Sequence, residues 1–157
     1  MKKELRKELL EMFKADQKAA VPFDPIFNEI IVKNKKRLDE IIKKFGWPSS
    51  NLVGKKGEMA AWLIVQHADF DVKFQEKCLK FLLKLPKTKE REKHIAYLTD
   101  RTLVNRRRKQ IYGTQFYPNK SGILTPRPIR DIHNIERKRA EVGLESFKTY
   151  KKRMEKK

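Results

Sequence analysis

The most apolar stretch of the chain is Ala60-Ala61-Trp62-Leu63-Ile64-Val65, which continues into Gln66-His67-Ala68-Asp69. Apolar residues all round a helix indicate that the helix is buried on every side. We therefore expect a central buried helix that starts near Gly57 and ends in the polar residues 66–69. The longest uncharged apolar run, residues 59–65, is far shorter than the ~20 residues that cross a bilayer, so we expect no membrane partner.

Apolar residues recur at helical spacing on both sides of this stretch, and breakers and capping residues separate the repeats. Gly46 suits a left-handed helix end, while Asp71 and Thr88 suit helix starts. The helical pattern ends after residue 109. There β-forming residues flank a Pro-Asn-Lys-Ser-Gly turn, which predicts a hairpin over about 110–125. The pattern predicts a mainly α fold of about five to seven helices with one small β-hairpin in the C-terminal third. The expected helices cover about 3–19, 28–45, 57–69, 72–85, 89–108, 135–141 and 145–155.

Length and cysteine content narrow the class of protein. The chain has 157 residues and one cysteine, Cys78, which excludes an internal disulfide and is expected to be a small core residue. The first residues lack the apolar segment of a signal peptide, so we expect a cytoplasmic protein. We expect one helical domain over 1–147, including the hairpin, and a basic C-terminal tail over 148–157.

The charge is strongly positive, with 39 Lys plus Arg against 20 Asp plus Glu and a net charge of +19. Cations gathered on one face neutralise phosphates, so one hypothesis is a nucleic-acid-binding module. The cations of that site would come from the dense run Arg106, Arg107, Arg108 and Lys109 and from the tail residues Lys151, Lys152 and Arg153. The alternative is a solvated lysine-rich surface with no partner.

His67 is the first candidate for chemistry, since it ends the buried helix. A helix C-terminus favours the charged form of a nearby histidine. A histidine held in this way is suited to general acid or base catalysis, with Asp69 or Asp100 to orient it and Gln66 beside it to bind substrate. The alternative is that His67 only caps the last carbonyls of its helix.

A second candidate is the pair Asp100 and Arg101, which lies in a helix among apolar residues. A buried charge is costly unless it is paired, so at least one of the two is expected to face the interior or a cleft. Arg101 offers a planar fork for a carboxylate or phosphate of a substrate. The alternative is a structural ion pair.

A third candidate is the segment 110–115, Gln-Ile-Tyr-Gly-Thr-Gln. On a strand, Gln110, Tyr112 and Thr114 would share one face, and Gly113 would let a ligand or another backbone approach closely. Gln110, Tyr112 and Gln115 are therefore candidate substrate-binding residues. No organic cofactor is expected. A divalent metal would draw its ligands from Asp16, His67, Asp69 and Asp100, although no helical ligand spacing supports such a site.

These blocks resemble a widespread bacterial family of unknown function, over about residues 4–147. The resemblance rests on residues 60–69, on Ala96-Tyr97-Leu98-Thr99-Asp100-Arg101 and on residues 110–116. An Asp-Gln pair late in the first helix matches Asp16 and Gln17, and further blocks match residues 46–48 and 139–144. In the family a histidine often follows residue 69, where Phe70 stands here, which weakens any site with a second imidazole ligand. The resemblance implies no activity.

The resemblance does imply that the polar residues of these blocks form one group in the folded protein. They are either one convergent pocket or a buried hydrogen-bond network that specifies the fold. The pocket, with Asp16 and Gln17 as further substrate-binding residues, predicts a cofactor-independent hydrolase or transferase acting on a small polar or anionic substrate. The network favours a nucleic-acid-binding module or a protein-interaction domain.

Overall fold

The computed structural model describes residues 1–19 and 25–156, which fold into two compact units, Met1–Phe81 and Leu82–Lys157. Each unit is described by itself. The described residues form seven helices and one two-stranded antiparallel sheet, which confirms the predicted fold class. The predicted single domain over 1–147 stays a prediction. The residues predicted as a tail supply most of the last helix, where Tyr150 is buried.

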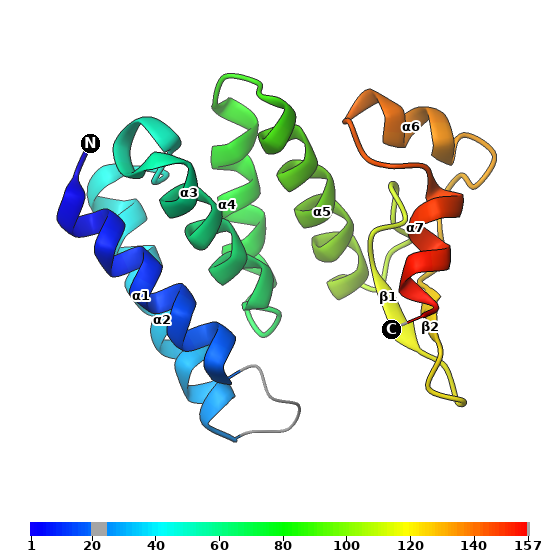
Figure 1. Ribbon diagram of the computed structural model, residues 1–157, viewed down its shortest axis with the longest axis horizontal. Coiled ribbons are helices and arrows are strands. Elements are labelled where there is room, and N and C mark those ends of the chain that lie inside the picture. The colour runs from blue at the N-terminus through cyan, green and yellow to red at the C-terminus, as the bar shows by residue number, and fades with distance from the viewer. Residues whose placement is uncertain (20–24, 157) are drawn as a thin grey trace. The chain divides into compact units, whose positions relative to one another are not determined.

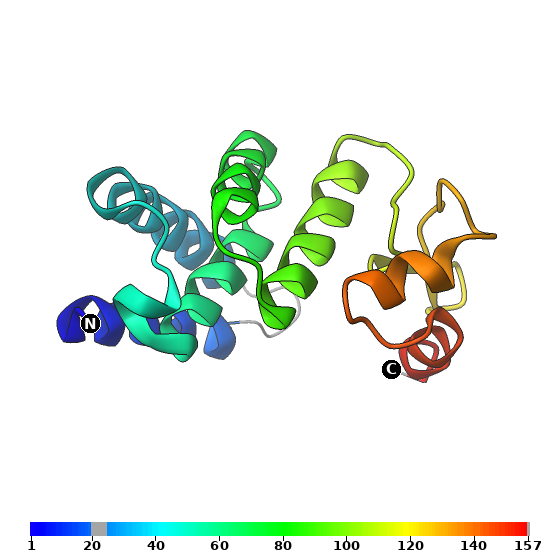
Figure 2. The ribbon, with the colours of Figure 1, turned by 90° about the horizontal axis from the view of Figure 1, so that it is seen from above.

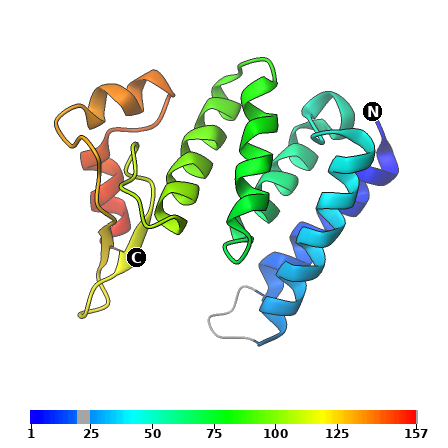
Figure 3. The ribbon, with the colours of Figure 1, turned by 180° about the vertical axis from the view of Figure 1, so that it is seen from behind.

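Unit 1 is a helical bundle in which α1 and α2 lie side by side (Figure 1 and Figure 3). Helix α1 contacts both α2 and α3, and α2 contacts α3. The bounds are α1 Lys3–Ala19, α2 Pro25–Phe45, α3 Ser50–His67 and α4 Val72–Lys84, whose last turn falls in unit 2. Many of the apolar positions predicted to face the core are buried, among them Leu5, Leu9, Leu38, Ile41, Ala61, Ile64 and Val65, whereas Phe45 at the end of α2 is exposed.

Helix α3 begins seven residues before its predicted start, because the segment predicted as a turn lies within it. Gly54 alone leaves helical geometry, with φ +74°, and it kinks the helix after its first turn. The buried carboxylate of Glu58 accepts hydrogen bonds from Ser50 N at 2.7 Å and from Trp47 Nε1 at 3.4 Å. This carboxylate satisfies a first-turn amide and so ties the early turn to the rest of α3.

Unit 2 consists of short elements around a small hairpin. Strand β1 pairs with β2 in antiparallel register, Phe116 with Pro126 and Pro118 with Leu124. Helix α7 contacts β2 and also α6, beside which it lies in Figure 2. The bounds are α5 Lys89–Asn105, β1 Phe116–Pro118, β2 Leu124–Pro126, α6 Ile135–Glu141 and α7 Phe147–Met154.

The predicted helix caps are confirmed. Asp71 Oδ1 accepts from Phe74 N at 3.0 Å at the start of α4, and Thr88 Oγ1 accepts from Arg91 N at 3.1 Å at the start of α5. Gly46 follows α2 with φ +72°, the left-handed conformation in which glycine has no Cβ penalty. These local signals explain why the helix boundaries can be predicted.

Cys78 lies in α4 with no exposed surface, and burial raises the pKa of its thiol to about 12. The thiolate is the reactive form, and a thiol with a pKa of about 12 holds on the order of 1,000-fold less thiolate at pH 8 than free cysteine, so we expect its reaction with a disulfide reagent to be slower by about that factor. Denaturant should restore the rate of the free thiol. Titration with a chromogenic disulfide, with and without urea, measures both rates. Fast, complete reaction of the folded protein would show that Cys78 is accessible.

Candidate functional site

His67 and Asp16 form a close pair within unit 1. Nδ1 of His67 lies 2.5 Å from Oδ2 of Asp16, and the packing of α1 against α3 brings the two together across 51 positions of sequence. The Asp16 side chain is 1% exposed, whereas that of His67 is 24% exposed. The structure thus places Asp16, predicted as a substrate-binding residue, on the imidazole ring.

This geometry has a chemical consequence. An ionised carboxylate only accepts hydrogen bonds, so its contact with Nδ1 requires the imidazole to carry a proton there. In the neutral ring the lone pair is then on Nε2, and Asp16 stabilises the charged ring that forms when Nε2 takes a proton. A buried carboxylate and a partly exposed imidazole in this arrangement suit general acid or base catalysis.

Two further buried polar atoms belong to the same elements. Oδ1 of Asp16 and Nε2 of Gln66 have no hydrogen-bond partner among the described residues. Buried polar atoms are satisfied in the great majority of cases, because desolvation without a partner costs free energy. Gln66 directly precedes His67 in α3, so α1 and α3 each hold a buried polar atom with unused hydrogen-bonding capacity.

The other polar residues around the end of α3 have different positions. Asp69 is exposed, and its Oδ1 accepts from Nε2 of Gln75 at 3.1 Å. Gln75 is fully buried in α4 and also donates to the carbonyl of Val65 at 3.1 Å, so it helps to close the end of α3. Gln17 lies exposed on α1. Sequence reasoning missed Gln75, although an amide among the apolar positions of α4 was a usable signal.

In unit 2, Asp100 organises the loop that follows α5. Its Oδ1 accepts from the amides of Ile111 at 2.7 Å and Tyr112 at 3.0 Å, and its Oδ2 accepts from the amide and hydroxyl of Thr114, both at 2.9 Å. Burial raises the pKa of the Asp100 carboxyl, and these hydrogen bonds oppose the rise. Asp100 is fully buried, and both of its carboxylate oxygens accept hydrogen bonds from the loop.

The two glutamines of this loop are also bound to protein. Gln110 donates to the carbonyls of Gln115 at 3.1 Å and Arg127 at 2.8 Å, and accepts from the amide of Gln115 at 2.9 Å. Gln115 donates its side-chain amide to Thr114 Oγ1 at 3.0 Å. Arg101 lies with Nη1 3.5 Å from Oε1 of Gln115. These contacts have the form of the buried network that the sequence left open as the alternative to a pocket.

The predicted strand over 110–115 is wrong in detail. That segment is a loop, apart from an isolated bridge at Gln110, and the first strand starts only at Phe116. The alternation of side chains expected for a strand therefore does not apply. Gly113 has φ +65°, and a Cβ there would lie 2.7 Å from the ring of Phe147 and 2.8 Å from Ile135. The close approach that Gly113 permits is made by these two side chains.

Arg139 completes the network and was missed from the sequence as a site residue. Its guanidinium is 1% exposed, donates from Nη1 to the carbonyl of Tyr112 at 2.6 Å and from Nε to that of Glu145 at 2.7 Å, and lies 4.8 Å from the ring centre of Tyr150. The hydroxyl of Tyr150 donates to the carbonyl of Thr114 at 3.1 Å. Burial lowers the pKa of Arg139.

The structure thus groups the predicted residues in two sets. Asp16, Gln66 and His67 belong to unit 1, and Asp100, Arg101, Gln110 and Gln115 belong to unit 2. Within residues 1–19 and 25–156, no three His, Cys, Asp or Glu side chains are placed to hold a metal ion.

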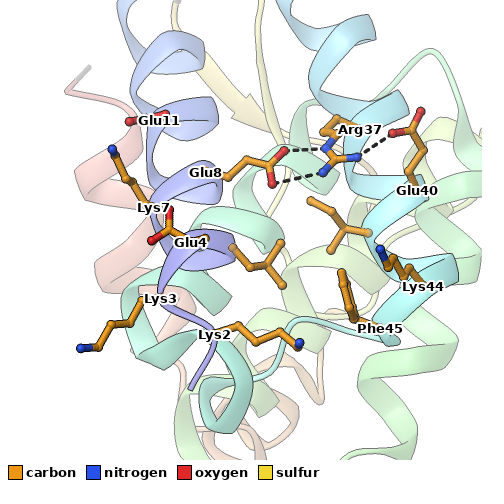
Figure 4. Close-up of a pocket in the computed structure, with 12 residues that line it drawn as sticks. Lys2, Lys3, Glu4, Lys7, Glu8, Glu11, Arg37, Glu40, Lys44 and Phe45 are labelled. Atoms are coloured by element: carbon orange, nitrogen blue, oxygen red, sulfur yellow. Dashed lines mark hydrogen bonds and ion pairs between the residues drawn. The ribbon is translucent and has the colours of Figure 1, made fainter.

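A groove of about 700 Å³ between α1 and α2 holds none of these residues. Figure 4 shows Arg37 between two carboxylates: its guanidinium contacts Glu8 at 2.5 and 3.2 Å and Glu40 at 2.9 Å. Five cationic and four acidic side chains line the groove, so its net charge is only +1 and it attracts an ion weakly.

Comparison with known proteins supplies the family. No described helix is both long and apolar enough to span a bilayer. No curated protein and no solved structure matches the chain. A family model, described as a family of unknown function (DUF6624), matches residues 3–157. The chain, with its Asp16–His67 pair and its Asp100-centred loop, therefore belongs to the DUF6624 family of unknown function.

Proposed function

We propose that this protein is an enzyme in which His67 is the general acid or base and Asp16 orients it. The carrying observation is the 2.5 Å contact between His67 Nδ1 and the buried Asp16 carboxylate. The reaction class is hydrolysis or group transfer on a small polar or anionic substrate. Neither reaction needs an organic cofactor, because a positioned imidazole can move the proton by itself.

In the proposed reaction, Nε2 of His67 takes the proton from a water or a substrate hydroxyl as that oxygen attacks the electrophilic centre. The same nitrogen then returns the proton to the leaving group, so that charge and atoms balance over the cycle. Asp16 stabilises the imidazolium between the two steps. Gln66, the residue before His67 in unit 1, would bind a substrate oxygen through its buried amide.

The simpler account, a histidine that only caps its helix, explains less. A cap needs a donor to the last carbonyls and no carboxylate behind the ring. Burying the carboxylate of Asp16 costs free energy that a surface cap would avoid. The unused Oδ1 of Asp16 adds to that cost among the described residues. Such an arrangement is common where a proton has to be moved.

The test combines turnover with the tautomer of His67. Nitrophenyl esters and phosphoesters serve as generic probes, and we expect His67→Gln to lower turnover by about 10²–10⁴-fold with the unfolding temperature nearly unchanged. Asp16→Asn should lower kcat and shift its pH profile. His133→Gln, which changes an exposed imidazole, is the matched control.

The tautomer gives a readout that needs no substrate. Long-range ¹H–¹⁵N spectra, recorded where the His67 ring is neutral, should show the ring proton on Nδ1. In Asp16→Ala the Nδ1 tautomer should no longer be favoured. Turnover that survives His67→Gln would overturn the proposal. A neutral ring protonated at Nε2 in the wild type would overturn it as well.

A further inference from the structure

A second concave surface lies in unit 2, outside the residues of the proposed active site. It is a hollow of about 610 Å³ at the end of α5, beside the hairpin. We name it the basic hollow, since four of its lining side chains are cationic and none is acidic. Its lining comprises Val104, Asn105, Arg107, Arg108, Lys109, Tyr117, Arg127 and Pro128.

The end of α5 builds one wall of the basic hollow. The amide of Arg107 donates to the carbonyl of Val104, and that of Arg108 to the carbonyl of Leu103, both at 2.8 Å. This paired pattern is the Schellman helix end, whose left-handed position usually holds glycine. Here the position holds Arg107, with φ +57°, while every other described residue with positive φ is glycine. The chain thus keeps a cation where glycine would relieve strain.

The opposite wall carries an arginine stacked on an aromatic ring. The guanidinium carbon of Arg127 lies 3.9 Å from the ring centre of Tyr117. The backbone of Arg127 is held on both sides, because its amide donates to Gln115 at 3.0 Å and its carbonyl accepts from Gln110 at 2.8 Å. The buried glutamine network therefore positions this stacked pair before any ligand arrives.

The cations of the basic hollow have no carboxylate partner among residues 1–19 and 25–156. Arg107, Arg108, Lys109 and Arg127 are all exposed, and no described carboxylate lies within 4 Å of their cationic groups. In the groove of Figure 4, by contrast, Arg37 contacts two carboxylates. Converging uncompensated cations in a concave surface raise the local concentration of anions. Arg106, included in the predicted basic run, does not line the hollow.

We propose that the basic hollow binds single-stranded nucleic acid. Phosphates would contact Arg107, Arg108 and Lys109, and an unpaired base would stack on the Arg127–Tyr117 pair. A duplex hides the faces of its bases, so the stacked pair favours a single strand. This activity is independent of the proposed catalysis by His67.

Fluorescence anisotropy with labelled fifteen-nucleotide dT and U strands tests the proposal. Changing Arg107, Arg108 and Lys109 to Gln should weaken binding at least about 10-fold and lower the slope of log K against log salt by about 2, since each single-strand phosphate contributes ~0.7. The control changes the exposed Lys84, Lys87 and Lys89 to Gln, which removes the same charge from the same unit and does not touch the lining of the hollow. Its effect should stay below about 3-fold.

Tyr117→Leu separates stacking from charge. It should weaken binding of the oligonucleotide. It should leave the affinity for inorganic tripolyphosphate, measured by competition, unchanged, because tripolyphosphate has no base to stack. The proposal would be overturned if the three-lysine control lost as much affinity as the variant of Arg107, Arg108 and Lys109, because diffuse charge would then explain binding. Tripolyphosphate binding as tightly as the strand, or a duplex binding more tightly, would overturn it too. His67→Gln should not change affinity, so failure here and failure of the catalytic proposal are distinguishable.

Arg107→Gly gives an independent readout. Glycine relieves the left-handed strain, so the variant should unfold at a higher temperature than the wild type while binding the strand more weakly. If the Arg107 side chain contacts the strand, the substitution raises stability and lowers affinity. Higher stability with unchanged affinity would show that its side chain has no part in binding.

Discussion

Replacing Asp100 with alanine is expected to destabilise unit 2 by about 3–6 kcal/mol, because each buried donor left without an acceptor costs about 1–3 kcal/mol. The substitution removes the acceptor of three backbone amides and of the Thr114 hydroxyl at once. Such a loss is a large part of the ~5–15 kcal/mol that stabilises a typical domain, so we expect unit 2 to unfold at a markedly lower urea concentration.

The intrinsic fluorophores allow this result to be assigned to one unit. Both tryptophans, Trp47 and Trp62, lie in unit 1, and all four tyrosines lie in unit 2. Near-ultraviolet circular dichroism of tyrosine should therefore lose its signal at lower urea in Asp100→Ala than in the wild type. Asp131→Ala, which removes a partly exposed carboxylate of the same unit and its ion pair with Lys138, should destabilise unit 2 far less. Equal effects of the two substitutions would contradict the central place of Asp100.

Gly113→Ala is expected to cost about 2–5 kcal/mol, the sum of about 1–2 for a left-handed alanine and about 1–3 for overpacking. Gly113 has φ +65°, and the added Cβ would lie 2.7 Å from the ring of Phe147. Two of the three clashing atoms belong to that ring, which packs with Phe116 at 6.4 Å between centres. The ring can therefore move only by disturbing its neighbours.

The control for this prediction is Gly122→Ala. Gly122 has φ +79°, but nothing lies within 4 Å of the Cβ that alanine would add. It shares the backbone penalty and lacks the clash, so the expected loss is about 1–2 kcal/mol. The difference between the two free energies of unfolding, from urea titrations, measures the packing part. A loss at Gly122 as large as that at Gly113 would contradict the proposed clash.

The helices could be predicted from the sequence because their signals are local. Asp71, Thr88 and Gly46 act on amides and carbonyls within a few residues, so their residue types suffice. The start of α3 could not be predicted in this way. Glu58 ties the first turn through its side chain, and the pair of glycines at 54 and 57 is typical of a turn.

The loop over 110–115 shows the limit of local patterns. Its residues favour a strand, but Asp100 takes the amides of residues 111, 112 and 114, which then cannot pair with another strand. Asp100 lies more than ten positions away, so composition cannot reveal the competition. A single carboxylate with three amides overrides the β propensity of the segment.

The candidate site was predicted in part. His67 stands out because a polar residue ends a buried helix. Asp16 was named by its residue type as a possible metal ligand, and by resemblance as a substrate-binding residue. Their contact depends on the packing of α1 against α3, which no spacing of residues encodes. Arg139 escaped notice because a cation on a short charged helix is usually exposed. Its burial depends on carbonyls and rings contributed by three separate segments.

The bonds from Arg139 and Tyr150 to the carbonyls of residues 112–114 also set an order for biosynthesis. On the ribosome, unit 1 can be completed while residues 82–157 are still being added. Unit 2 cannot close around Asp100 until residue 150 has left the exit tunnel. During translation the nascent loop therefore lacks these partners, and a chain that ends before residue 150 would lack the contacts that close unit 2.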